Sequence, residues 1–177
     1  MNADAKARAA QRRLMLGVLL LAACFAAGAQ TATPAEPLVG KMAPEFTRRD
    51  LNGASINLAS FRGKVVLLDF WATWCASCQV EMPVFVQWKR EYGPRGLQVI
   101  GISMDDDSQL ARRMKAKLRL NYPVAMGDEK LGELYGGVLG LPLTYLIDRK
   151  GKVRAKFQGE TDLKTIEKQL KALLAEP

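Results

Sequence analysis

The sequence contains no histidine and only three cysteines among its 177 residues. Without an imidazole there is no Ser-His or Cys-His dyad, no imidazole general base and no imidazole ligand for a metal ion. Three thiols cannot form a zinc site of four thiolates, and the common alternative also needs two imidazoles. They are too few for the dense disulfide framework of small secreted proteins. The chemistry must therefore use carboxylates, amines, hydroxyls or thiols, and we expect no cofactor and no metal site.

Uncharged apolar sequence is concentrated near the N-terminus. Residues 1–13 carry four basic residues and one acid, and the following 16 residues, 14–29, carry no charge. This pattern predicts a secretory signal peptide and leaves a membrane anchor open. Cleavage after Ala29 would release a soluble protein, whereas Cys24 follows a sequence similar to the bacterial lipobox and is a candidate for lipidation. We expect a protein of the bacterial periplasm, tethered to a membrane by the apolar segment or by a lipid.

The positive charge is modest in the exported part of the chain. The formal net charge is +8, but without residues 1–29 there remain 22 basic and 17 acidic residues, a net charge of +5. The densest basic cluster falls within residues 112–119, on an expected helix. It has no interleaved aromatic residues, and the protein is exported, so we expect a solvated helix face and no nucleic-acid partner.

The remaining sequence divides into a linker and one domain. Residues 30–39 are rich in Ala, Thr and Pro and predict a flexible linker, followed by a single domain over residues 40–177. Buried strands are predicted where short runs of β-forming residues occur, and helices where apolar residues recur at helical spacing. The expected strands are 65–71, 97–103, 122–126, 143–148 and 152–157; the expected helices are 75–92, 108–120, 130–135 and 162–174. With a hairpin around Asn52-Gly53, this order predicts a three-layer α/β domain with a mixed central sheet.

Cys75 and Cys78 form a Cys-x-x-Cys motif between an expected strand and an expected helix. At this spacing the two side chains share one helix face, within reach of a disulfide. Cys75 lies at the helix N-terminus, where free amides and the helix dipole stabilise a thiolate, so it is the expected nucleophile. Cys78 would then resolve the mixed disulfide. A purely structural disulfide is disfavoured because it would close a very short loop, two thiolates alone are an incomplete metal site, and Gln79 rules out CxxCH haem attachment.

The segments LLDFWATWCASCQVEMP, MAPEF and GLPLTYLIDRKGKV resemble the TlpA/ResA-like thiol–disulfide oxidoreductases of the thioredoxin superfamily. The resemblance runs from about Gly40 to the C-terminus. It implies a thioredoxin fold with an added N-terminal β-hairpin and an inserted βα element around residues 104–126. It also implies that the Cys-x-x-Cys pair is the only redox centre.

The resemblance assigns roles to two carboxylates. Asp69 matches the buried acid of thioredoxins, which could take the proton of Cys78 as that thiol attacks. The alternative is a polar strand residue satisfied by hydrogen bonds. Glu81 matches a glutamate near the thiols that could raise their pKa values and relay protons, and its alternative is a surface acid on the helix.

The resemblance also assigns residues around the thiols. Pro142 matches a cis-proline that faces the Cys-x-x-Cys, so that the backbone of Leu141 pairs with an extended substrate; the alternative is an ordinary trans proline. Trp74, with Trp71, is expected to shape an apolar rim. Pro83 matches a proline that kinks the long helix.

The implied function is a periplasmic reductant of disulfides in partner proteins. No histidine is available to stabilise the Cys75 thiolate, which favours a reducing pair. The expected substrate is apocytochrome c or a copper-site assembly protein, the expected electron donor is a membrane protein of the thiol type, and a monomer is expected. The alternatives are a thiol peroxidase, although no proline precedes Thr73 in the usual pattern, and a Cu(I)-binding metallochaperone, although the chain lacks the expected histidine.

Overall fold

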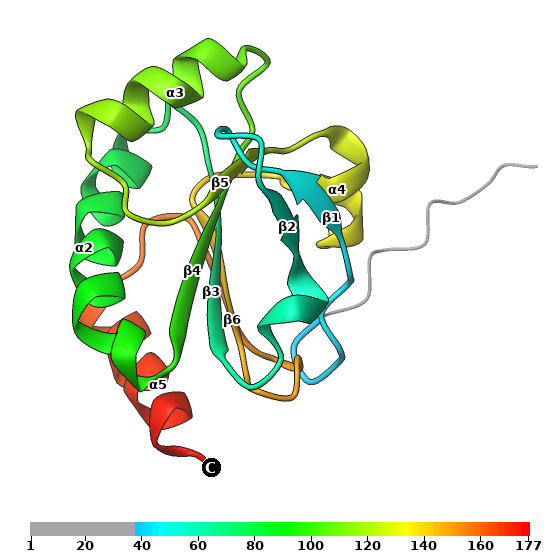
Figure 1. The fold of residues 1–177 in the computed structure, drawn as a ribbon, viewed down its shortest axis with the longest axis vertical. Helices are drawn as coiled ribbons and strands as arrows, with labels where there is room; N and C mark the ends of the chain where they lie inside the picture. Colours follow the sequence, from blue (N-terminus) through cyan, green and yellow to red (C-terminus); the bar gives the residue numbers. More distant parts are fainter. Residues whose placement is uncertain (1–37) are drawn as a thin grey trace, which may run out of the picture. The chain divides into compact units, whose positions relative to one another are not determined.

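The computed structural model describes residues 38–177, so the predicted signal or anchor, Cys24 and most of the predicted linker lie outside the described residues. Among the described residues, no helix has the length and apolar character needed to cross a membrane. The following account therefore concerns the domain from residue 38 onward (Figure 1).

A five-stranded mixed sheet in the order β5-β4-β3-β6-β7 forms the centre of the domain. Strands β3 (Val65–Trp71), β4 (Leu97–Ser103) and β5 (Val124–Met126) are parallel, while β6 (Leu143–Ile147) and β7 (Val153–Gln158) form an antiparallel hairpin beside β3. Every residue of β3 and β4 is buried. Both strands consist largely of β-branched and other apolar residues because both of their faces are covered.

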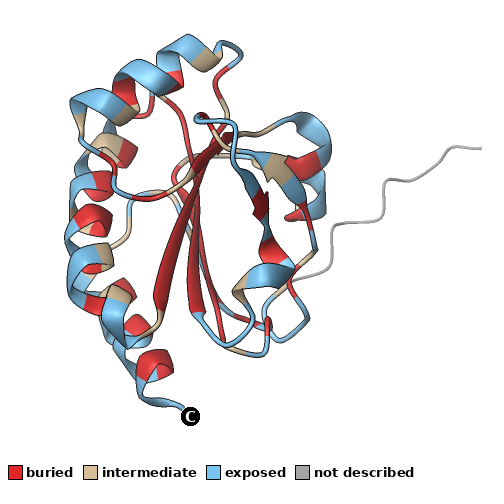
Figure 2. Ribbon diagram, in the orientation of Figure 1, coloured by how far each residue is buried: buried red, intermediate tan, exposed pale blue. Residues whose placement is uncertain are grey.

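The side chains of β3 alternate between its two faces and contribute to two separate halves of the core. Figure 2 shows the central strands coloured as buried. On one face, Leu67 and Trp71 pack against α2 (Ala76–Tyr92), α3 (Ser108–Lys117) and α5 (Leu163–Ala175). On the other face, Leu68 and Phe70 pack against the hairpin of β1 (Thr47–Arg49) and β2 (Ser55–Asn57), the 3-10 helix Leu58–Phe61 and α4 (Glu129–Leu134). The sheet and the elements that cover its two faces form the three layers that the sequence predicts.

The architecture confirms the predicted thioredoxin fold, N-terminal hairpin and mixed sheet, with shifts at element ends. Helix α3 and strand β5 lie within the segment in which the inserted βα element was predicted. Strand β5 begins at Val124 rather than at residue 122, because Pro123 has no N–H with which to pair. Helix α3 ends at Lys117 rather than at residue 120, and the chain then turns through Arg119, whose φ is 51°.

Candidate active site

Cys75 lies at the junction between the central strand and the longest helix. Strand β3 ends at Trp71, helix α2 begins at Ala76, and Cys75 is the N-cap residue of α2. Its Sγ accepts a hydrogen bond from the backbone N–H of Cys78 at 3.2 Å. A sulfur in this position faces the unpaired amides and the positive end of the helix dipole, both of which favour a thiolate.

Cys75 and Cys78 form a disulfide with a Cα–Cα distance of 5.3 Å. Cys75 is 6% exposed and Cys78 is 1% exposed, so Cys75 is the more accessible of the two. The hydroxyl of Ser77 lies 3.6 Å from the Cys75 sulfur. Trp74, which directly precedes Cys75, is exposed, and its side chain is available to a partner protein.

The loop before β6 runs beside this junction. In the antiparallel pairing of β3 and β6, Phe70 is opposite Leu143, which places Leu141 and Pro142 next to the end of β3. The Leu141–Pro142 peptide bond is cis, and the carbonyl of Pro142 accepts a hydrogen bond from Gly159 at 2.8 Å. Leu141 packs partly buried against the core cluster that contains both cysteines. The three predicted substrate-binding residues thus flank the cysteine pair.

Asp69 is buried on the face of β3 that packs against α2. Its Oδ1 accepts a hydrogen bond from the hydroxyl of Thr144 at 3.3 Å, and its Oδ2 has no hydrogen-bond partner. Burial, and secondarily the negative charge of Glu81, raise the pKa of Asp69 from 3.8 to about 8, against the lowering effect of Thr144. Oδ2 is therefore the carboxyl oxygen of Asp69 that no hydrogen bond occupies.

Glu81 is also buried, at 5% exposure, one helical turn after Cys78. Burial raises the pKa of Glu81 to about 7; the backbone of Thr161 lowers it by hydrogen bonding and the charge of Glu160 raises it. The alternative of a solvent-exposed acid on the helix is therefore wrong. The site holds two carboxyl groups whose pKa values both lie near neutral pH, and the charge of Glu81 favours the protonated form of Asp69.

An apolar groove adjoins the thiols where α2 faces the start of α5. It has a volume of about 480 Å³. Two short segments line the groove. One comprises Ala76, Ser77, Val80 and Glu81 of α2, and the other comprises residues 160–164. Because Val80 is exposed, this surface and Trp74 together give the rim of the site its apolar character.

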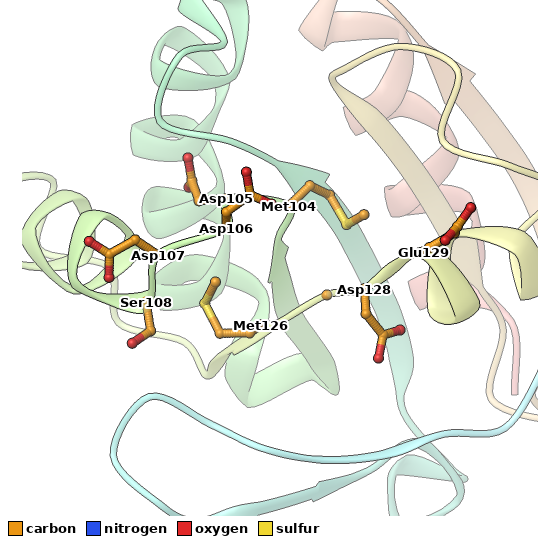
Figure 3. A pocket seen from close by; sticks show the side chains of 9 residues that line it. Met104, Asp105, Asp106, Asp107, Ser108, Met126, Asp128 and Glu129 are labelled. Atoms are coloured by element: carbon orange, nitrogen blue, oxygen red, sulfur yellow. The ribbon is translucent and has the colours of Figure 1, made fainter.

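A second pocket, of about 580 Å³, opens at the carboxyl ends of β4 and β5 (Figure 3). Most of its lining is acidic or sulfur-containing. The lining residues are Asp105, Asp106, Asp107, Asp128, Glu129, Met104 and Met126, and also Ser108 and Gly127. Asp105 turns toward the active-site loop, where both of its carboxylate oxygens accept hydrogen bonds from Thr73. Sequence reasoning missed Asp105 and Thr144 because neither belongs to the Cys-x-x-Cys segment.

One prediction about the rim is wrong. Trp71 is fully buried, because its position on β3 directs the side chain toward α2 rather than to the surface. Its indole Nε1 and the hydroxyl of Tyr122 are buried without hydrogen-bond partners. Only Trp74 of the two tryptophans contributes to the rim.

No group of three or more acidic or cysteine side chains among residues 38–177 is arranged to hold a metal ion. The two sulfurs of the site are joined to each other. This bond is of the kind that thiol–disulfide exchange opens and closes.

Comparison with known proteins agrees with this chemistry. Residues 39–156 match the AhpC/TSA family. The chain is 36% identical over 137 residues to the thiol-disulfide oxidoreductase ResA of Bacillus thuringiensis subsp. konkukian, with 76% of this chain and 78% of the relative covered. The chain belongs to the ResA-like thiol–disulfide oxidoreductases of the AhpC/TSA family. It is an enzyme of thiol–disulfide exchange built on the thioredoxin fold.

Two further relatives support membership of this ResA-like group. The thiol:disulfide interchange protein DsbE of Pseudomonas fluorescens biotype C is 36% identical over 153 residues, covering 83% of each chain. The crystal structure of a putative DsbE from Chlorobium tepidum superposes with a TM-score of 0.72 at 33% identity, covering 77% of this chain and 98% of that one.

Replacement of Asp69 by Asn should change how the stability of the oxidised protein depends on pH. The folded carboxyl, with its pKa raised to about 8, keeps a proton that the unfolded chain releases above its ordinary value of 3.8. The free energy of unfolding of the wild type therefore falls as pH rises between these two values. Asp69→Asn should reduce this fall by up to about 1.4 kcal/mol per pH unit, measured by urea unfolding of the disulfide form.

The exposed acid Asp106 provides the matched control. Asp106→Asn makes the same substitution at the surface, where there is no burial to perturb the carboxyl, and should leave the pH dependence of stability unchanged. An unchanged slope in Asp69→Asn would show that Asp69 is ionised in the folded protein throughout this range.

Proposed function

We propose that the protein is a reductant of disulfides in partner proteins of the bacterial periplasm. The observation that carries the proposal is the arrangement at the β3–α2 junction: Cys75 caps the helix as the more accessible sulfur, while Cys78 lies deeper, one helical turn before the buried Glu81. An attacking thiol must be accessible, and a resolving thiol is best activated by a base inside the protein.

In the reduced protein, the Cys75 thiolate attacks one sulfur of the substrate disulfide. The substrate S–S bond breaks, one substrate sulfur leaves as a thiolate, and a mixed disulfide forms. Cys78 then gives its proton to Oδ2 of Asp69 and attacks the Cys75 sulfur, which releases the second substrate thiolate. The protein dithiol has lost two electrons and the substrate disulfide has gained them. A thiol-type donor in the membrane returns the protein to the dithiol state.

The carboxyl pair supports the reducing direction. The charge of Glu81 raises the pKa of Asp69. Negative charge on Glu81, one helical turn after Cys78, opposes a thiolate, and a less stabilised thiolate makes a dithiol a better reductant. We propose apocytochrome c or a copper-site assembly protein as the substrate, met by Trp74, Leu141 and Pro142. Attachment through residues 1–29 or a lipidated Cys24 would hold the domain at the membrane, and we propose that it acts as a monomer.

The two alternative functions have less support. The hydrogen bonds of the Cys75 sulfur come from Cys78 and Ser77, and in the described part of the chain no arginine reaches it, as the peroxidase pattern would require. Within residues 38–177, no acidic side chain or further cysteine joins the two sulfurs in a group of three that could hold a metal ion. Both alternatives would leave the buried carboxyls without a role.

The variant Cys78→Ser should accumulate mixed disulfides with its substrates. Cys75 can still attack, but no second thiol releases the product. When Cys78→Ser is expressed in the native periplasm, non-reducing electrophoresis and mass spectrometry should reveal a few specific adducts that dithiothreitol dissolves. Cys75→Ser is the matched control and should trap none. Equal trapping by both variants, or none by Cys78→Ser, would contradict the assignment.

The rate of resolution should depend on pH through both carboxyls. Asp69→Asn should slow release of the mixed disulfide by about 100-fold, the usual contribution of a general base. Glu81→Gln removes the charge that raises the pKa of Asp69. The base would then ionise at lower pH, and the half-maximal rate should shift to lower pH.

Stopped-flow measurement of product release from a preformed Cys75 adduct tests both variants. Asp106→Asn should follow the wild-type profile. A Glu81→Gln profile displaced to higher pH would be inconsistent with coupling between the two carboxyls.

A further inference from the structure

The loop that leads to Cys75 is attached to the end of the neighbouring strand. Parallel strands β3 and β4 pair Trp71 with Ser103, and two residues further on Thr73 lies beside Asp105. The backbone N–H of Thr73 donates to both carboxylate oxygens of Asp105, at 3.0 and 3.1 Å, and its hydroxyl lies 2.6 Å from Oδ1. The loop is thus tied to β4 through one carboxylate.

Asp105 is itself fixed in place. It is 5% exposed, and its Oδ2 accepts a hydrogen bond from the hydroxyl of Ser103 at 2.8 Å. The backbone N–H of Asp105 also donates to that hydroxyl, at 3.3 Å. A buried carboxylate with several donors is strongly oriented, since each charge-assisted hydrogen bond fixes its geometry.

Thr73 is held from a second side as well. Its carbonyl accepts a hydrogen bond from Nε2 of Gln79 in helix α2, at 2.9 Å. The N–H, the hydroxyl and the carbonyl of Thr73 are therefore all engaged. Thr73 is the last residue fixed in this way before the exposed Trp74 and the nucleophile Cys75.

We propose that Asp105 is a positioning residue of the disulfide-exchange site, which holds Thr73 so that Trp74 and the sulfur of Cys75 are presented to a protein substrate in one orientation. Asp105 touches neither the substrate nor the reacting sulfurs and acts through Thr73. The inference rests on thiol–disulfide exchange at Cys75 and does not depend on the role of Asp69 or on the identity of the partner.

Of the three consecutive acids at this position, Asp105 alone contacts the active-site loop. Asp107 caps helix α3 by accepting from the N–H of Gln109 at 2.8 Å, and Asp106 is exposed. Figure 3 shows the three side chains beside one another at the second pocket. Asp106 is therefore a matched control, because it is also an aspartate and directly follows Asp105 in the chain.

The expected consequence is a difference between two reaction rates, one with a protein disulfide and one with a small thiol. In-line attack on a protein disulfide requires Trp74 and the Cys75 sulfur in a defined orientation, and small displacements are costly. Dithiothreitol needs no docking surface. Loosening of Thr73 should therefore weaken reaction with a protein disulfide much more than reaction with dithiothreitol.

The experiment compares two rates for each variant. Insulin is reduced by the pre-reduced protein in single turnovers over a range of insulin concentrations, and the Cys75–Cys78 disulfide is separately reduced by dithiothreitol. Asp105→Ala should lower the second-order rate constant with insulin about tenfold, mainly through a higher half-saturating insulin concentration, with the dithiothreitol rate within about twofold of wild type.

A second set of variants keeps the test valid if Asp105→Ala does not fold. Thr73→Val removes the hydroxyl and should show the same separation to a smaller extent. Thr73→Ser keeps the hydroxyl and should react with insulin at the wild-type rate. Asp105→Asn keeps one acceptor oxygen and should fall between Asp105→Ala and wild type.

Three results would overturn the proposal. Parallel losses with insulin and dithiothreitol would show a general structural role. A loss in Asp106→Asn equal to that in the Asp105 variants would show an effect of overall charge. Wild-type rates in Asp105→Asn and Thr73→Val would show that the loop needs no attachment to β4.

Discussion

The site depends on the junction at which the buried strand β3 becomes the helix α2. Strand β3 cannot shift, because both of its faces are packed and both of its edges are paired. The helix that follows therefore starts at a fixed point, and its first free amides meet the sulfur of Cys75. Backbone geometry thus distinguishes two chemically identical thiols and favours Cys75 as the nucleophile that we propose.

Burial explains the two raised carboxyl pKa values. Asp69 lies in an apolar strand with one hydrogen bond, and Glu81 lies one helical turn beyond Cys78. Burial of a charge without a compensating cation is costly, so both groups favour protonation near neutral pH. In a chain without histidine, these carboxyls are the groups beside the thiols that titrate in that range.

Much of this could be predicted from the sequence. Apolar runs and helical spacing identified the five strands of the central sheet and the helices α2, α3, α4 and α5, and the Cys-x-x-Cys motif located the redox pair. The burial of Trp71 follows from the predicted buried strand, although this residue was expected at the rim. The burial of Glu81 was not predictable in the same way, because it depends on how α2 faces the start of α5. The contact between Thr73 and Asp105 needed the register of β3 against β4. Once adjacent parallel strands are recognised, residues at equal distances beyond their ends become candidates for such contacts.

The reduction potential of the Cys75–Cys78 pair tests the central claim most directly. The purified protein is equilibrated with glutathione redox buffers, and its dithiol and disulfide forms are quantified after alkylation. A reductant should have a potential at or below about −230 mV, toward the value of about −270 mV for thioredoxin. A potential near about −120 mV, the value for the oxidant DsbA, would contradict the account.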